Sequence, residues 1–171
     1  AECYRQLCNG NSSGGSAYGF QYLLSWKCRD AELITQHIGM RLGLSEWRSE
    51  VEFVKKSHLT RRVLQCRRSV NDWISQIDNC AYMVTNSFHG TIFAILFQKP
   101  FISLELSGSS LEMGMNERLI SLLDHLGLRH RLVGEFSEDK IDVLLNEQIG
   151  WADVFIRLQG WRQEATVFLE N

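Results

Sequence analysis

The sequence contains no apolar stretch close to the ~20 residues that a membrane-spanning helix requires. Neither sign of charge dominates, since 18 basic side chains stand against 20 acidic ones and the formal net charge is −2. This balance excludes the basic surplus by which proteins that bind nucleic acid or anionic membranes are usually recognised. Residues 1–4 lack Met and the basic-then-apolar order of a signal peptide, so we expect a processed chain or a piece of a longer one.

Motifs of metal and nucleotide chemistry are also missing. No C-x-x-C pair is present, and the spacing of Cys3 and Cys8 matches zinc ligands poorly. The 5 cysteines are irregularly spaced, which favours reduced thiols and a cytoplasmic location. The sequence lacks a P-loop, G-x-G-x-x-G, H-E-x-x-H and G-x-S-x-G, so nucleotide, zinc and hydrolase functions lose their usual support. We therefore predict neither a metal nor a cofactor.

What is present is the composition of a globular protein. The 44% hydrophobic and 22% charged fractions are typical of a chain that builds a core rather than of a disordered one. A length of 171 residues fits one domain. Glycine, serine and asparagine fill residues 9–16. We predict an N-terminal segment with this Gly/Ser-rich loop over 1–19, and a single α/β domain over 20–171.

Short apolar runs then alternate with helical periods. The pattern predicts strands at 20–26, 51–54, 82–85, 101–104 and 132–133, and helices beginning near 30, 69, 91, 116, 137 and 152. Around 82–104 the order of strand, polar turn, apolar helix and strand is typical of a βαβ unit with parallel strands. This alternation predicts an α/β fold with a Rossmann-like parallel sheet flanked by helices.

Several residues are expected to fix the helices. Ser69 with Asp72 predicts a capped helix start, and Asn116 is expected to cap another helix. Gly127 is expected to end that helix. Leu33 and Val70 are placed by helical spacing on the buried faces of their helices.

The polar turn at residues 86–91 is the predicted functional site. In parallel sheets, ligands bind beyond the carboxyl ends of strands, where the N-termini of the following helices also point. Free N–H groups of a first helical turn attract phosphate or carboxylate. Ser87 and Thr91 offer hydroxyl groups, and Gly90 allows close approach to the backbone. His89 can change its charge near neutral pH, so we predict an anion site with a proton donor beside it.

These residues also fit plainer roles. Ser87 can simply cap the helix, and His89 can be an ordinary turn residue. Arg118 is expected at a helix start just after the loop at 107–110, where its guanidinium would bind carboxylate or phosphate bidentately. Its alternative is a solvent-exposed helix arginine. The remaining histidines fit structural or surface positions: His37, His58, His125 and His130.

Three segments carry a resemblance to a known family. They are residues 69–74 (SVNDWI), 84–93 (VTNSFHGTIF) and 99–102 (KPFI), followed in order by 118–123, 126–128 and 131–133. Residues 161–169 are similar to a closing helix of the same family. In these segments the chain resembles the polysaccharide pyruvyl transferase family. The resemblance is specific over about residues 69–133 and weak before residue 60.

The resemblance implies the C-terminal lobe of a two-lobed GT-B-type transferase. It implies transfer of pyruvate, as a ketal, from phosphoenolpyruvate to a sugar of a polysaccharide or its precursor. His89 would serve donor binding and catalysis, by donating a proton or by stabilising the departing phosphate, and Arg118 would contact the donor. The chain is about half the family's usual length, which implies a missing N-terminal lobe. The expected partners are phosphoenolpyruvate and a sugar or lipid-linked saccharide, and not nucleic acid.

Two other functions fit the same residues. The donor lobe of a sugar-nucleotide-dependent glycosyltransferase would share the architecture and the anion-binding helix end. Binding of phosphoenolpyruvate but not of UDP would argue against it. A non-catalytic module that binds sugars or anions would keep the fold without turnover, and it would tolerate removal of the His89 side chain.

Overall fold

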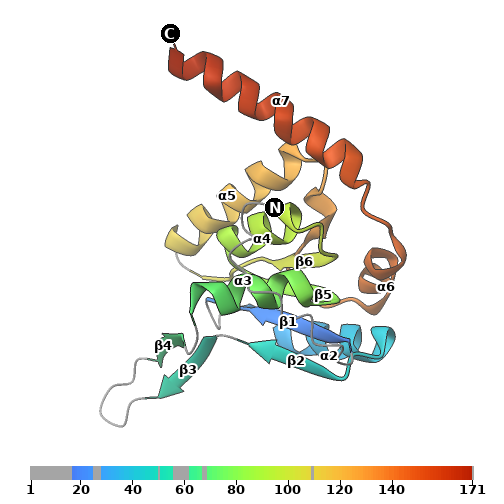
Figure 1. The fold of residues 1–171 in the computed structure, drawn as a ribbon. Helices are drawn as coiled ribbons and strands as arrows, with labels where there is room; N and C mark the ends of the chain where they lie inside the picture. The colour runs from blue at the N-terminus through green and yellow to red at the C-terminus, as the bar shows by residue number, and fades with distance from the viewer. Residues whose placement is uncertain are drawn as a thin grey trace.

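The structure is a computed structural model that describes residues 17–24, 28–49, 51–55, 62–66, 69–108 and 110–170. Its centre is a 5-stranded sheet of order β2-β1-β5-β6-β7 (Figure 1), and all its neighbouring strands are parallel. The predicted α/β, Rossmann-like fold is therefore confirmed. The Gly/Ser-rich stretch at 9–16, and with it most of the predicted segment 1–19, lies outside the described residues.

The strands of this sheet are β1 (Tyr18–Tyr22), β2 (Glu46–Ser49), β5 (Tyr82–Thr85), β6 (Phe101–Leu104) and β7 (Leu132–Val133). The predictions for β5, β6 and β7 are confirmed residue for residue. β1 begins earlier than predicted and ends at Tyr22. β2 was not predicted because its sequence, Glu-Trp-Arg-Ser, is partly exposed and contains no apolar run.

A second, 2-stranded sheet is formed by β3 (Val51–Lys55) and β4 (Arg62–Cys66), which pair antiparallel. The strand predicted at 51–54 is present, but it belongs to this ribbon and not to the parallel sheet. The ribbon extends from the body at the lower left of Figure 1. A strand in a two-stranded ribbon has the same local pattern as one in a larger sheet, so the sequence alone does not separate them.

The helices are α2 (Ala31–Leu42), α3 (Val70–Asn79), α4 (Phe88–Leu96), α5 (Ser110–His125), α6 (Glu138–Asn146) and α7 (Trp151–Glu170), and a short 3-10 turn, η1 (Arg129–Arg131), precedes β7. The predicted cap of α3 is confirmed, since the backbone N–H of Asp72 donates to Ser69 Oγ at 3.2 Å. Gly127 follows α5 with a φ of 72°, as a left-handed residue that ends a helix does.

Two helices begin earlier than predicted. α4 includes residues 88–90 in its first turn, with Ser87 as the N-cap. α5 begins at Ser110, so the prediction that Asn116 caps it is wrong. Asn116 lies inside the helix, where its carboxamide accepts from Leu106 N at 2.9 Å and donates to Leu106 O at 2.8 Å. Arg118 is consequently in the middle of α5 and not at its start.

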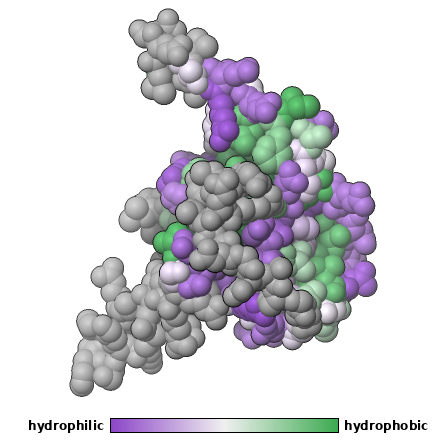
Figure 2. All heavy atoms as spheres, in the orientation of Figure 1, coloured by the Kyte–Doolittle hydropathy of each residue, from purple (hydrophilic) through white to green (hydrophobic). Residues whose placement is uncertain are grey.

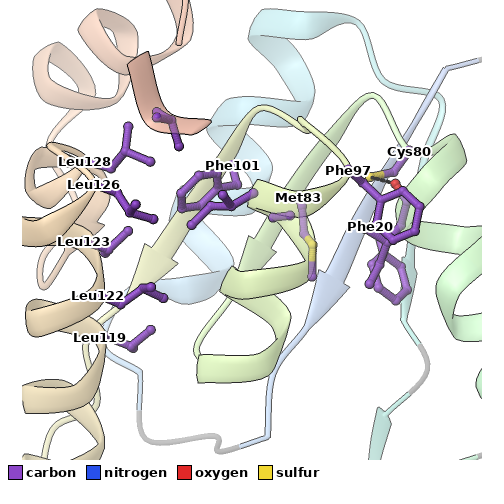
Figure 3. Packing of buried hydrophobic residues seen from close by; sticks show 14 of the residues in the cluster. Phe20, Cys80, Met83, Phe97, Phe101, Leu119, Leu122, Leu123, Leu126 and Leu128 are labelled. Atoms are coloured by element: carbon purple, nitrogen blue, oxygen red, sulfur yellow. Dashed lines mark hydrogen bonds between the residues drawn. The ribbon is translucent and has the colours of Figure 1, made fainter. Parts of the chain in front are cut away.

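Helices cover both faces of the parallel sheet. One face packs on α3, α4, α5 and α7, and the other packs on α2 and α6. Phe20, Met83 and Phe101 point from three neighbouring strands into the first cluster, shown in Figure 3. Val84 and Ile102 point into the second cluster, because successive strand residues face opposite sides. The sheet is thus held rigidly between two apolar layers, and its carboxyl edge positions the loops.

Two expectations about buried faces are wrong. Leu33 and Val70 are 49% and 70% exposed, because each lies at the border of its helix's apolar stripe. Among the described side chains of α7, Val154 is buried and Trp161 stacks on His125 with ring centroids 4.4 Å apart. The far half of α7 extends away from the body (Figure 1), and Phe168 is 82% exposed.

Hydrophobic groups gather on the surface where α7 leaves the body and along the side that carries α6 (Figure 2). Among the described residues, no helix is both long enough and apolar enough to cross a membrane. α7 has the length, but arginines, acids and glutamines interrupt its apolar positions.

Candidate functional site

The chain reverses its direction across the sheet between β1 and β5. From β1 it continues through α2 to β2 on one side, and from β5 it continues through α4 to β6 on the other. The carboxyl ends of the two strands are adjacent, since Tyr22 pairs with Thr85. Such a switch point is where open α/β sheets bind ligands. The predicted turn at 86–91 directly follows β5, so it lies at this point.

Thr85 and Ser87 fix the start of α4. The Thr85 hydroxyl is fully buried, donates to Tyr22 O at 2.7 Å and accepts from Ser87 N at 3.0 Å. Ser87 Oγ in turn accepts from Gly90 N at 3.2 Å. Ser87 therefore has the capping role that the sequence offered as its plainer alternative. A direct contact of this buried side chain with a donor molecule stays a prediction.

Gly90 and Thr91 pack the first turn of α4 onto the sheet. A Cβ at Gly90 would collide with Thr85 Oγ1 and would lie 3.1 Å from Tyr22 Cδ1, so packing requires glycine here. The buried Thr91 hydroxyl donates to Ser87 O at 3.1 Å and lies 2.7 Å from Ser103 Oγ. Both residues serve the geometry of the turn, and their part in donor binding stays a prediction.

His89 and two backbone amides remain open at this helix end. The His89 side chain is exposed, and its ring meets the Phe88 ring edge-on at 5.8 Å. Within the part of the chain that the structure describes, the imidazole of His89 and the backbone N–H groups of Phe88 and His89 have no hydrogen-bond partner. These N–H groups carry the positive end of the α4 dipole, so the helix end has a partial positive charge.

Arg118 reaches the same place from α5. Its guanidinium Cζ lies 4.3 Å from the centroid of the Phe88 ring, a cation–π contact. The Phe88 ring is thus in contact with both Arg118 and His89. Among the described residues no carboxylate lies within ion-pair distance of Arg118, so its charge is uncompensated. The structure brings together the two residues that the sequence proposed as proton donor and anion ligand.

Sequence reasoning did not single out Asn86. Its side chain is 0% exposed, although it belongs to a polar turn. Its Oδ1 accepts from Leu24 N at 2.7 Å, and its Nδ2 donates to Cys28 Sγ at 3.1 Å. The available signal was an amide residue placed directly after a fully buried strand, where a polar side chain needs partners.

An aromatic wall adjoins the turn and was also missed. The Tyr22 ring packs edge-on against Trp73 at 5.2 Å between centroids, and Trp73 packs against Phe93 at 4.9 Å. These residues come from β1, α3 and α4, and only their packing in three dimensions reveals them as one group. Tyr22 brings this wall to the first turn of α4, since its Cδ1 would lie 3.1 Å from a Cβ at Gly90.

The other histidines have structural partners. His37 Nε2 lies 2.8 Å from Asp142 Oδ1, and His130 Nε2 lies 3.0 Å from Glu147 Oε2. His125 stacks on Trp161, while His58 lies outside the described residues. The structural or surface roles predicted for His37, His125 and His130 are confirmed.

Two further features bear on where a ligand could sit. A groove of about 800 Å³ runs beside β7 and α6, but neither His89 nor Arg118 lines it. Cys28 and Cys80 are free thiols, as predicted. In the described residues no three or more His, Cys, Asp or Glu side chains form a group able to hold a metal ion.

Comparison with known proteins extends the sequence resemblance. The family model for polysaccharide pyruvyl transferase matches residues 14–108, more than half of the chain. The match includes Asn86 and His89 and begins well before residue 60, where only weak similarity was expected. It ends before α5, so the placement of Arg118 rests on the structure alone. No curated protein matches the sequence. On a match of this extent, centred on the parallel sheet and its switch-point turn, the chain belongs to the polysaccharide pyruvyl transferase family.

Proposed function

We propose that the α4 start binds phosphoenolpyruvate for transfer of its pyruvyl group to a sugar of a polysaccharide or its precursor. The observation that carries this proposal is the uncompensated Arg118 beside an exposed His89 and two open N–H groups. Phosphoenolpyruvate has two anionic groups, a phosphate and a carboxylate. The helix N–H groups suit one of them, and a guanidinium binds the other bidentately.

The chemistry requires a proton at the methylene carbon of phosphoenolpyruvate. Protonation turns this carbon into a methyl group and leaves the neighbouring carbon cationic. A sugar hydroxyl adds to that carbon and loses its proton, the bond to the phosphate oxygen breaks, and phosphate leaves. A second hydroxyl of the sugar then closes the ketal and loses its proton.

His89 has one of two roles in this sequence. It either transfers the proton to the methylene carbon or stabilises the departing phosphate with a hydrogen bond, and only the first role needs a proton that is given up. Glutamine separates the two roles, because its amide donates a hydrogen bond but transfers no proton. His89→Gln should be as inactive as His89→Ala in the first role, and should retain part of the turnover in the second.

We also propose that this chain is the donor lobe of a two-lobed transferase of the GT-B type. The support is the single parallel sheet, with its open helix end at one edge. The sugar or lipid-linked acceptor would then be presented by an N-terminal lobe. Adding that lobe should raise pyruvylation, whereas this chain alone should already bind phosphoenolpyruvate.

Isothermal titration of the chain with phosphoenolpyruvate tests donor binding. We expect binding by the wild type and weaker binding by His89→Ala. His130→Ala is the control, because this exposed histidine pairs with Glu147 away from the turn. Binding of UDP in place of phosphoenolpyruvate would indicate a glycosyltransferase lobe. Binding of neither would indicate a non-catalytic module.

Turnover tests the catalytic role. In an active, two-lobed form, His89→Ala should lose about 10²–10⁴-fold in kcat, which is the range of general acid–base catalysis. Its urea midpoint should equal that of the wild type, because the side chain is exposed and has no hydrogen-bond partner among the described residues. Unchanged pyruvylation in this variant would exclude His89 from the reaction.

A further inference from the structure

We propose that Asn86 is a positioning residue for the donor: its buried carboxamide holds the connection between β1 and α2 beside the α4 start and thereby sets the geometry of the anion site. The inference rests on the proposed function. It adds a residue that touches neither the donor nor the reacting atoms and that acts through the two segments meeting at the switch point.

The contacts of Asn86 join one side chain to two points of that connection. Oδ1 accepts from Leu24 N at 2.7 Å, and Nδ2 donates to Cys28 Sγ at 3.1 Å. Leu24 and Cys28 stand on either side of residues 25–27 in the sequence. A single carboxamide therefore binds both ends of this stretch, and its 0% exposure removes water as a substitute partner.

The position of Asn86 explains why this link matters for the site. The ladder between β1 and β5 ends at the pair Tyr22 and Thr85. The bond from Leu24 N to Asn86 continues the link between the two segments beyond the sheet. Asn86 also directly precedes Ser87, the N-cap of α4. Phe88 and His89 are two and three residues further along the chain. A movement of Asn86 therefore also moves their N–H groups.

The adjoining Thr85 cannot replace this function. Its hydroxyl is committed to Tyr22 O and Ser87 N, which lie at the strand end and at the cap. Loss of the carboxamide would leave the strand ends paired but would release the connection next to the turn. Groups that bind a small anion must be held to a fraction of an ångström, so affinity should fall before stability does.

The first test compares the affinity of three variants of the chain for phosphoenolpyruvate. Asn86→Ala should weaken binding roughly tenfold, because misplacement of binding groups is costly. Asn79→Ala is the matched control, since its carboxamide bonds Ser75 O at 2.8 Å at the opposite end of the sheet. Ile77→Val lowers stability from a fully buried position away from the turn. Both controls should bind like the wild type.

The second test measures, in the absence of any ligand, how firmly the connection between β1 and α2 is held. Burial raises the pKa of the Cys28 thiol, and the hydrogen bond from Asn86 lowers it. Loss of that hydrogen bond alone would slow alkylation of Cys28, so faster labelling can come only from release that exposes the thiol. In Asn86→Ala, iodoacetamide labelling of Cys28, resolved by peptide mass spectrometry, should be several-fold faster. Cys80 is the internal reference, because it is buried on α3's side of the core. Its labelling should not change, which separates local release from global unfolding.

Each outcome decides the proposal. Wild-type affinity in Asn86→Ala overturns it, and so does an equal loss of affinity in Ile77→Val at matched stability. If Asn86→Ala does not fold, Cys28→Ala removes the contact with Asn86 Nδ2 and should still weaken binding measurably. An unchanged affinity then overturns the proposal. If the wild type does not bind phosphoenolpyruvate, the proposed function fails instead. Labelling of Cys28 then still shows whether Asn86 holds the connection, and an unchanged rate refutes that.

Discussion

For Gly90→Ala, the structure predicts a loss of stability, whereas helix propensity alone predicts a gain. In a helix interior, alanine is more stable than glycine by about 0.5–1 kcal/mol. At Gly90, however, the added methyl would collide with Thr85 Oγ1 and would lie 3.3 Å from Ser87 Cβ. Thr85 is fully buried and cannot turn away without breaking its bonds to Tyr22 O and Ser87 N.

The magnitude follows from these opposing effects. Overpacking in a well-packed region costs about 1–3 kcal/mol, and a buried polar group that loses its partner costs a further ~1–3 kcal/mol. Relaxation of the turn reduces this sum, and the propensity gain offsets part of it. We expect Gly90→Ala to lower the free energy of unfolding by about 2 kcal/mol, which is a shift of about 1 M in the urea midpoint.

Urea unfolding followed by circular dichroism measures this change, and the chain offers a matched control. Gly114 lies within α5 with nothing within 4 Å of its Cβ position, so Gly114→Ala should raise stability by about 0.5–1 kcal/mol. In a Thr85→Ala background the clash is gone, so Gly90→Ala should cost at least about 1 kcal/mol less than in the wild type. A Gly90→Ala protein as stable as Gly114→Ala, or additive effects with Thr85→Ala, would refute the reasoning.

Three further predictions concern charge and burial. Arg118→Ala should weaken binding of phosphoenolpyruvate by about 10- to 100-fold, the range of one charge-assisted hydrogen bond, and an unchanged Kd in isothermal titration would remove this residue from the site. The hydrogen bond from His37, with the nearby Arg41, holds the pKa of Asp142 below its usual 3.8. The carboxylate therefore stabilises the folded state above about pH 4, and this contribution disappears as the pH falls through the lowered pKa. The difference in urea midpoint between wild type and Asp142→Asn should shrink on acidification, and a constant difference from about pH 7 to 3 would contradict the assignment. Burial raises the pKa of the Cys80 thiol to about 12, so at pH 8 iodoacetamide should reach it only through unfolding, and labelling as fast as that of an unfolded chain would show that it is accessible.

The centre of the sheet could be predicted because burial leaves a local pattern. β5 and β6 are buried along their whole lengths, so they read as short apolar runs between polar turns. The edge strand β2 leaves no such pattern, since Glu46 and Ser49 are exposed. Asn116 was misplaced for a related reason. Its carboxamide satisfies a loop backbone, as a capping residue would, but does so from within a helix.

The site could be predicted only where it is local in sequence. The turn at 86–91 stands between a buried strand and an apolar helix, so a polar group such as His89 stood out there. The packing of Arg118 on Phe88 depends on how α4 and α5 cross, which no spacing encodes. The bond between Leu24 and Asn86 joins residues 62 positions apart. Such a contact is invisible until the parallel sheet brings the two strand ends together.

Amide hydrogen exchange should be slower in the first half of α7 than in the second, although the two halves form one continuous helix. Val154 and Trp161 anchor the first turns to the body, whereas Phe168, near the other end, is exposed. Exchange protection follows local opening, so it should decline steadily past Gly160 rather than end at a loop. A protease that cleaves after Arg162 should accordingly shorten the protein while leaving the melting of its sheet unaltered.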